Sequence, residues 1–190
     1  TVWCVDKNIE KINLLNENQI PIFEPGLQEL VLKNHSAGRI KFTTNLEVAV
    51  NSSDIIFICV GTPAVNKNGS ADLRYVFQAA KEICKFINKF KIIVTKSTVP
   101  VTTGDKIEKL ISKKKKKKLF EVVSNPEFLR EGEAIRDFRF PDRIVIGSNN
   151  KSATRKLQTL YDPLIKKGAK FFSTNRRGAE IIKYASNAFL

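Results

Sequence analysis

The chain has 190 residues, 42% of them hydrophobic, which is enough to bury one substantial core and argues against disorder. No apolar run approaches the roughly 18 residues that a membrane span needs, and no leader-type segment opens the sequence. We therefore expect a cytoplasmic protein with no membrane partner. Cys4, Cys59 and Cys84 are widely spaced in apolar contexts, which predicts reduced core residues and supports neither disulfides nor a metal site.

The formal net charge of +14 raises nucleic acid as a partner, because lysine and arginine clusters neutralise phosphates. Six consecutive lysines, Lys113 to Lys118, supply +6 of this charge, and the rest is spread without an obvious stripe. The run is typical of a solvated surface loop. We therefore predict no nucleic-acid partner, with a basic noncatalytic nucleic-acid-binding module as the alternative from another class.

Short apolar runs alternate with amphipathic stretches along the chain. Strands are predicted at 2–5, 40–43, 54–60, 91–95, 119–123, 143–147 and 169–173. Helices are predicted at 8–16, 26–33, 45–50, 72–87, 103–111 and 152–160, a polar loop after Pro63, and a last amphipathic segment at 175–190. Parallel strands need crossover connections, and each crossover helix must bury one side. The alternation therefore predicts an α/β fold with a mostly parallel sheet and helices on both faces.

The first predicted strand ends in Asp6, a position with meaning in a Rossmann-type doubly wound sheet. There a carboxylate at the end of the second strand accepts hydrogen bonds from the adenosine ribose of NAD, and its charge disfavours NADP. Read alone, an Asp at a strand end is also a common loop residue. The glycine-rich turn that should precede it is absent from this sequence. We therefore expect a first strand and helix upstream of Thr1.

Four segments resemble the UDP-glucose/GDP-mannose dehydrogenase family. They are IFEPGL (22–27), KSTVPVTT (96–103), SNPEFLREGEAIRDFRFPDRIVIG (124–147) and KYASNAFL (183–190). The resemblance covers the whole chain apart from the lysine run. It implies an NAD-binding domain at 1–174 and, from 175 to 190, the start of a central helix that links two domains and forms a homodimer interface.

The family's reaction is a four-electron oxidation of a nucleotide sugar by two NAD molecules, through aldehyde and thioester stages. The PDR at 141–143 resembles the enzymes that convert UDP-glucose to UDP-glucuronate for polysaccharide synthesis. GDP-mannose and UDP-N-acetylmannosamine remain the alternative substrates within the family.

The resemblance implies four catalytic residues. Lys183 and Asn187 match the groups that stabilise the alkoxide, and their spacing of four places both on one helix face. Thr98 and Glu127 match the pair that holds the hydrolytic water. Without the resemblance, Lys183 would be read as a solvated helix lysine and Thr98 as a turn former.

Cofactor and substrate contacts are implied at further positions. The NAD contacts are expected at Asp6, Lys11, Val60, Gly61, Thr62, Pro63, Ser97, Thr98 and Glu131. Many relatives have Arg where Lys11 stands, which weakens that assignment. The substrate contacts are expected at Glu127, Phe128, Leu129, Arg130, Glu131, Lys183 and Asn187, with the backbone of 128–130 gripping the substrate.

The thioester stage needs a low-pKa cysteine in a glycine-rich sequence, which the family places downstream. None of the three cysteines has that setting, and Cys59 is predicted to be a core residue of its strand. We therefore expect the 190-residue chain by itself to be inactive.

Overall fold

A computed structural model describes residues 1–65 and 70–189. The chain divides into two compact units, which are treated one at a time. Unit 1 comprises 1–53 and 129–139, and unit 2 comprises 54–128 and 140–190. The polar loop predicted after Pro63 falls largely on residues 66–69, and the last predicted segment ends at Leu190; these positions lie outside the described residues.

Unit 1 contains a two-stranded parallel sheet. Its elements are β1 (Val2–Val5), α1 (Ile9–Asn16), α2 (Leu27–Ser36), β2 (Ile40–Thr43), α3 (Leu46–Ser52) and α6 (Ala134–Arg139). Asn8 and Asn45 cap α1 and α3, since each side chain accepts a hydrogen bond from the backbone N–H three residues on. The helices predicted at 8–16, 26–33 and 45–50 are thus confirmed, although α2 runs three residues further.

Unit 2 is built on a five-stranded sheet in the order β3-β6-β7-β8-β9. The strands are β3 (Ile55–Ile58), β6 (Lys91–Thr95), β7 (Phe120–Ser124), β8 (Arg143–Gly147) and β9 (Lys170–Thr174). All neighbours are parallel except β7 and β8, which meet antiparallel at one pair, Ser124 and Gly147. The mostly parallel α/β fold is confirmed.

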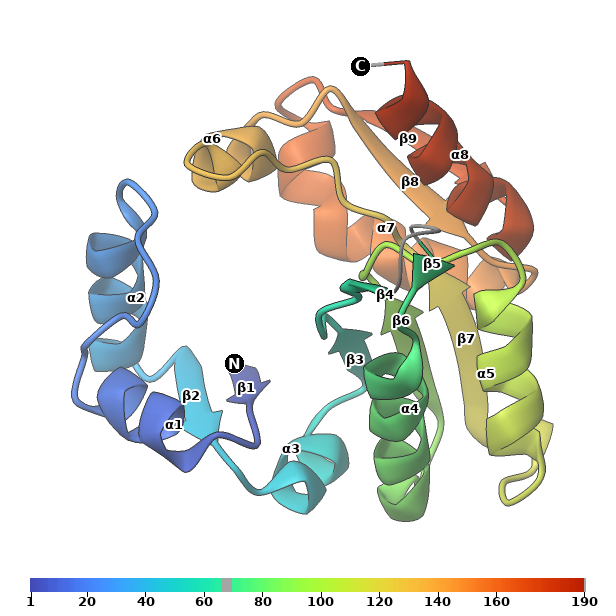
Figure 1. Ribbon diagram of the computed structural model, residues 1–190, viewed down its shortest axis with the longest axis horizontal. Helices are drawn as coiled ribbons and strands as arrows, with labels where there is room; N and C mark the ends of the chain where they lie inside the picture. The colour runs from blue at the N-terminus through green and yellow to red at the C-terminus, as the bar shows by residue number, and fades with distance from the viewer. Residues whose placement is uncertain (66–69, 190) are drawn as a thin grey trace. The chain divides into compact units, whose positions relative to one another are not determined.

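Helices cover both faces of this sheet (Figure 1). They are α4 (Arg74–Phe86), α5 (Thr103–Ser112), the short 3-10 helix η1 (Lys117–Leu119), α7 (Lys151–Ile165) and α8 (Arg176–Ala188). On one face α7 buries Leu157 and Tyr161 against Val94, Val123 and Ile146. Helices α4, α5 and α8 lie on the other face (Figure 1). The predicted sites of α4, α5, α7 and α8 are confirmed, and α7 extends five residues past its predicted end, whereas η1 was not predicted.

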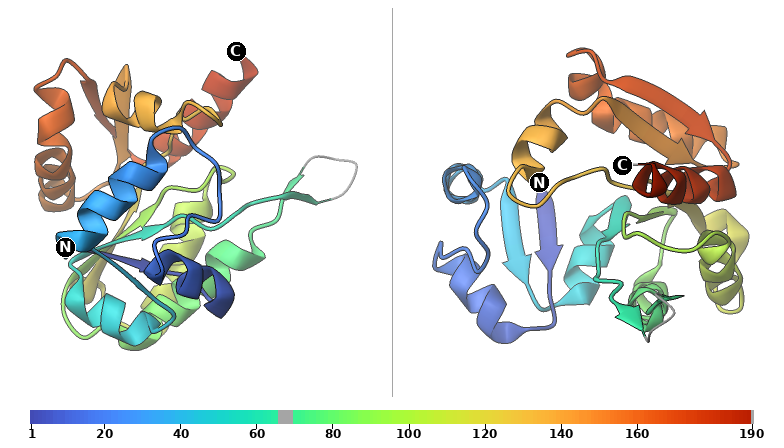
Figure 2. Two further views of the ribbon diagram at one scale, coloured as in Figure 1. Left: turned by 90° about the vertical axis from the view of Figure 1, so that its left-hand side faces the viewer. Right: turned by 45° about the horizontal axis from the view of Figure 1, so that its top comes forward.

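A short antiparallel pair, β4 (Ala64–Val65) and β5 (Ser70–Ala71), was not predicted. Figure 2 shows it projecting from unit 2. Helix α8 groups with unit 2 by its contacts. The domain boundary after residue 174 and the further strand and helix before Thr1 stay predictions.

The prediction that the cysteines are core residues is wrong for Cys59. Strand β3 ends at Ile58, so Cys59 lies past its end and is exposed, whereas Cys84 is buried and Cys4 half-buried. The strand is shorter than predicted because its pairing with β6 stops at Ile58 and Thr95.

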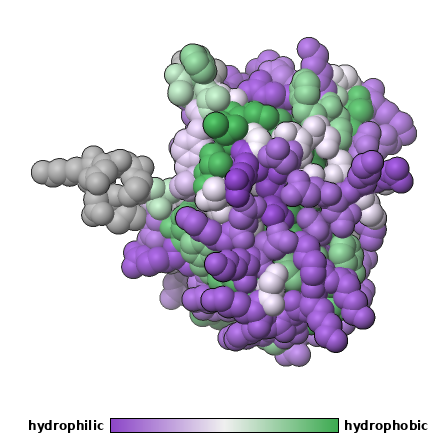
Figure 3. All heavy atoms as spheres, turned by 90° about the vertical axis from the view of Figure 1, so that its right-hand side faces the viewer, coloured by the Kyte–Doolittle hydropathy of each residue, from purple (hydrophilic) through white to green (hydrophobic). Residues whose placement is uncertain are grey.

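The lysine run is only partly the solvated loop that was predicted. Lys113, Lys114 and Lys116 to Lys118 are exposed. The face of the protein drawn in Figure 3 is largely hydrophilic. Lys115, however, donates to the carbonyl oxygen of Ile87 at 2.6 Å. Lys117 forms an ion pair with Glu108 and another, at 3.3 Å, with Glu121.

Candidate active site

The carboxyl ends of three parallel strands of unit 2 form one edge of the sheet. Ile58, Thr95 and Ser124 are aligned across β3, β6 and β7. The next residues continue the alignment, since the N–H of Lys96 donates to Ile58 O at 3.0 Å and that of Asn125 to Thr95 O at 2.9 Å. Ligands of open α/β sheets bind beyond such edges.

The loops that leave β3 and β6 are joined by side-chain hydrogen bonds. Thr62 Oγ1 donates to the carbonyl oxygen of Thr98 at 2.9 Å, and Ser97 Oγ donates to that of Val60 at 2.6 Å. A Cβ at Gly61 would meet no atom within 4 Å, so the backbone there is open to a close-lying ligand. The predicted cofactor residues of 60–63 and 97–98 therefore form one cluster.

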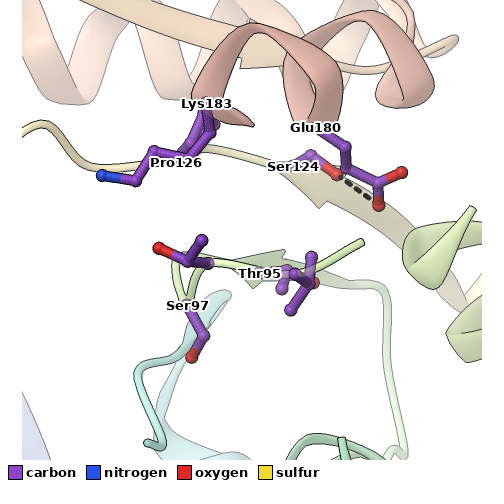
Figure 4. A pocket seen from close by; sticks show the side chains of 8 residues that line it. Thr95, Ser97, Ser124, Pro126, Glu180 and Lys183 are labelled. Atoms are coloured by element: carbon purple, nitrogen blue, oxygen red, sulfur yellow. Dashed lines mark hydrogen bonds between the residues drawn. The ribbon is translucent and has the colours of Figure 1, made fainter. Parts of the chain in front are cut away.

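A small cavity lies between these loops and α8 (Figure 4). It measures about 10 Å³, room for roughly one water molecule. The lining residues are Thr95, Ser97, Thr98, Val99, Ser124, Pro126, Glu180 and Lys183. Thr95 is 2% exposed, and its Oγ1 is buried without a hydrogen-bond partner among the described residues.

Lys183 is not the solvated lysine that an isolated helix position suggests. Its side chain is only 9% exposed, and its ammonium group lies 5.4 Å from the centre of the Phe128 ring. Burial lowers the pKa of Lys183, and the negative charge of Glu127 opposes this effect. The cation is held at the edge of the sheet, close to a carboxylate and to the cavity.

Glu127 faces a second cation that sequence reasoning missed. Lys96 follows β6 directly, and burial lowers its pKa, while Glu127 and the nearby Cys59 oppose the shift. Glu127 also acts on Tyr161, whose hydroxyl donates to Asn125 Oδ1 at 2.6 Å. Burial raises the pKa of Tyr161. The KST motif contains Lys96, but only the fold brings it to the glutamate.

The structure brings Thr98, Glu127 and Lys183 to the same edge of unit 2, whereas Asn187 stays outside the cavity. Asn187 lies four residues after Lys183 on α8, as predicted, but its side chain is exposed and does not line the cavity. Phe128 lies between two cations, since the guanidinium of Arg143 is 4.5 Å from its ring centre.

Unit 1 holds the two residues predicted to meet the adenosine end of the cofactor. Asp6 follows β1, accepts from the N–H of Asn8 at 3.0 Å and pairs with Lys11 Nζ at 2.8 Å. The hydrogen bond from Lys11 is the largest of the effects that lower the pKa of Asp6. The carboxylate stays ionised and 37% exposed, which suits it to accept hydrogen bonds from a ribose diol. These residues therefore fit NAD.

The segment after Phe128 belongs to unit 1, where internal contacts fix it. Arg130 donates to Asp137 from its side chain at 2.6 Å and from its backbone N–H at 3.0 Å. The hydrogen bond from Arg130 lowers the pKa of Asp137 to about 2. Glu24, from the IFEPGL motif, accepts from the N–H of Gly132 at 3.0 Å. The backbone N–H of Arg130 is thus already bonded within the protein.

Glu127 belongs to unit 2, and Glu131, which is exposed, belongs to unit 1. Leu129 is half-buried in unit 1. The substrate contacts predicted for 129–131 stay predictions.

A parallel sheet with crossover helices and polar loops at its carboxyl edge defines a Rossmann-type nucleotide-binding fold. Residues 1–165 match the family model described as "UDP-glucose/GDP-mannose dehydrogenase family, NAD binding domain". The chain therefore belongs to this family, and NAD is its cofactor.

Individual relatives agree with this assignment. The UDP-glucose 6-dehydrogenase of Rhizobium meliloti is 51% identical over 100% of this chain and 44% of its own length. The solved UDP-glucose dehydrogenase of Pyrobaculum islandicum is 40% identical with a TM-score of 0.92, covering 99% of this chain and 44% of its own. The solved GDP-mannose dehydrogenase of Pseudomonas aeruginosa is 38% identical with a TM-score of 0.93, covering 99% of this chain and 44% of its own. The chain thus spans less than half the length of these relatives.

Among residues 1–65 and 70–189, we find no helix with the length and apolar character needed to cross a membrane.

Proposed function

We propose that the full-length protein oxidises UDP-glucose to UDP-glucuronate, with NAD as the acceptor of two hydrides. The observation that carries this proposal is the buried Lys183, which lines a cavity together with Thr98 and interacts with Glu127. These three residues come from the loop after β6, the loop after β7 and helix α8, and they lie at the edge where ligands of this fold class bind.

Each residue has a role that its chemistry supports. Loss of a hydride from an alcohol requires a developing negative charge on oxygen to be stabilised, and a preorganised ammonium group does this in a dry site. Lys183 supplies the charge, and Asn187, on the same helix, donates a hydrogen bond to the same oxygen. Thr98 and Glu127 orient the water for the later hydrolytic step.

Asp6 and Lys11 in unit 1 and the loops at 60–63 and 97–98 in unit 2 would hold NAD, which supplies the hydride acceptor. The thioester stage also needs a cysteine nucleophile, and the exposed Cys59 lies in no glycine-rich sequence. We therefore propose that residues 1–190 alone do not turn over, and that the complete protein is a homodimer.

The proposal is tested by NADH formation with UDP-glucose, GDP-mannose and UDP-N-acetylmannosamine as separate substrates of the full-length protein. We expect UDP-glucose to give the highest kcat/KM. Substituting Lys183→Ala should lower kcat by about 10²–10³-fold, because the alkoxide loses its main stabilising charge. Lys106→Ala, at an exposed lysine of α5, is the matched control and should leave kcat unchanged.

Two results would contradict the proposal. Preferred turnover of GDP-mannose or UDP-N-acetylmannosamine would assign the protein to another substrate within the family. Retention of full turnover by the Lys183→Ala variant would remove Lys183 from the chemistry.

A further inference from the structure

The first turn of α5 lacks a cap from its own sequence. The residue before this helix, Thr102, has a left-handed backbone with φ 79°, and its side chain makes no capping hydrogen bond. The first N–H groups of any helix need acceptors from outside the helix. A β-branched residue rarely adopts this conformation, so the surrounding structure must hold it there.

Glu180 of α8 supplies the acceptors that α5 lacks. Its Oε2 accepts from the N–H of Thr102 at 2.7 Å, and its Oε1 accepts from the N–H of Gly104 at 2.7 Å. A third donor, Ser124 Oγ, is 3.4 Å from Oε1, as the dashed line in Figure 4 shows. Glu180 is 3% exposed, so this is a buried carboxylate bonded mainly to a helix N-terminus.

Gly104 allows the carboxylate to come this close. A Cβ at Gly104 would lie 3.1 Å from Glu180 Oε1, 3.2 Å from Arg176 Cδ and 3.4 Å from Ser124 Oγ. The first two distances are tighter than ordinary contact, so a side chain here would force the Glu180 carboxylate and the Arg176 side chain to shift by a few tenths of an ångström. The hydrogen bonds of Glu180 to the N-terminus of α5 therefore depend on a glycine at position 104.

This arrangement links the two elements that carry Thr98 and Lys183. The loop with Thr98 runs from β6 to α5, and Glu180 fixes its far end at Thr102. Lys183 follows Glu180 by three residues on α8, so both side chains leave the same side of the helix. Both line the cavity that Thr98 also lines (Figure 4).

We propose that Glu180 is a positioning residue, which locks α8 to the N-terminus of α5 and so holds Lys183 and Thr98 on one reacting centre. This inference rests on the proposed function, because it assumes that Lys183 acts on the substrate. An error of about 1 Å in the placement of a catalytic group costs roughly 100-fold in rate. Weakening the hydrogen bonds between Glu180 and the N-terminus of α5 should therefore lower kcat more than it affects cofactor binding.

The test uses the full-length protein with the variants Glu180→Gln and Glu180→Asp. Glutamine keeps the size but presents an NH₂ group to one of the two backbone donors, and aspartate is too short to reach both. We expect kcat per folded molecule to fall by roughly 10–100-fold for the glutamine variant and by less for the aspartate variant. The KM for NAD should change by less than about twofold, since most of the predicted NAD contacts, among them Asp6, Lys11 and the loop at 60–63, do not touch Glu180.

A double variant separates positioning from a general structural role. In a Lys183→Ala background, the first oxidation is already limited by the missing ammonium group. Adding Glu180→Gln should then lower kcat by less than about threefold, because residues that act through one another are not additive. Asp162→Asn, which removes an exposed ion pair with Lys166 on α7, is the matched control and should leave kcat unchanged.

Three results overturn the inference. The first is near-normal kcat in a folded Glu180→Gln variant, and the second is a full 10–100-fold loss in the Lys183→Ala background. The third is failure of both single variants to fold, as seen by urea denaturation, which would make Glu180 a stability residue only. The proposed function is judged separately by the wild type, whose inactivity with all three sugars would remove both proposals.

Discussion

Helix α8 carries two buried cations whose surroundings differ. Arg176, in the first turn, is 7% exposed. Its guanidinium group forms ion pairs with three carboxylates, those of Asp105 at 2.8 Å, Glu108, and Glu121 at 3.8 Å. Lys117, from the lysine run, joins the same cluster through Glu108 and Glu121. The charges here cancel within the protein.

Lys183, two turns further along the same helix, has no comparable set of carboxylates. The described residues give it the charge of Glu127, the ring of Phe128 and the repulsion of Arg143. Lys96 is a second partly buried cation whose field acts on Glu127. A buried cation with close partners stabilises a fold, whereas one that faces a loosely paired carboxylate at a ligand-binding edge is available for chemistry.

Removing Arg176 should have the largest effect on stability. The change Arg176→Met leaves Glu121, which is 5% exposed, and Glu108 without their central cation. We expect the free energy of unfolding to fall by about 3–5 kcal/mol, measured by urea denaturation. The neighbouring Arg177→Met is the control. Because Arg177 is 66% exposed, its ion pair with Asp105 should be worth less than about 1 kcal/mol. Equal losses for the two variants would contradict the distinction between the buried, multiply paired Arg176 and the exposed Arg177.

Enlarging Gly147 should displace the helix that carries both cations. A Cβ at Gly147 would lie 2.5 Å from Ala179 Cβ and 2.9 Å from Arg176 Cα, and neither neighbour can rotate away. Gly147→Ala should therefore lower the free energy of unfolding by about 1–3 kcal/mol through overpacking. Gly61→Ala, where a Cβ meets no atom within 4 Å, should leave stability unchanged. A fully stable Gly147→Ala variant would show that α8 can shift without cost.

The ion-pair cluster of Arg176 and Lys117 with Glu108 and Glu121 should also control the stability of the protein in acid. Burial alone would raise the pKa of Glu108, but the hydrogen bond from Lys117 and the charge of Arg176 outweigh it and lower the pKa below 4.5. The unfolded chain therefore binds more protons than the folded protein in this range, and stability rises with pH. The contribution is complete above about pH 4.5 and is lost as the pH falls through the lowered folded pKa.

Glu108→Gln tests this pH dependence through the free energy of unfolding between about pH 3 and pH 6. The variant should lose on the order of 1 kcal/mol at pH 6 and show a flatter acid limb than the wild type. Asp142→Asn, at an exposed carboxylate, should keep the wild-type slope. An unchanged slope for Glu108→Gln would mean that other carboxylates set the acid limb.

The sequence predicted most strands where short runs of apolar or β-branched residues are bounded by polar ones. Strands β6 and β8 have the predicted bounds and are almost wholly buried, and β1 and β2 also have the predicted bounds although none of their residues is fully buried. Cys59 was misplaced because an apolar run does not show where strand pairing stops. The extra hairpin of β4 and β5 was missed because each strand has only two residues, too few to show an alternating pattern.

The candidate site was predicted only through motifs, and its supporting residues were not predicted at all. Thr98, Glu127 and Lys183 followed from the resemblance. Glu180 and Lys96 look like ordinary surface residues in the sequence, since the burial of a charged group depends on tertiary packing. The spacing of three between Glu180 and Lys183 is a signal in the sequence that could have placed the glutamate on the face of α8 that carries Lys183.

The smallest expected effect concerns the lysine run, Lys113 to Lys118. Within these six residues, too, some cations are bonded within the protein and others are solvated. Lys113, Lys114, Lys116 and Lys118 are exposed and, unlike the exposed Lys117, lie outside the ion pairs with Glu108 and Glu121. Replacing these four with serine should change the free energy of unfolding by less than about 0.5 kcal/mol and leave turnover unchanged. Lys115→Met should cost about 1 kcal/mol, since the ammonium group binds the carbonyl oxygen of Ile87 at the C-terminal end of α4. A heparin column run at increasing salt reports any polyanion binding. If the serine variant loses both heparin binding and dehydrogenase activity, the run is part of the enzyme's function rather than an exposed loop around two structural lysines.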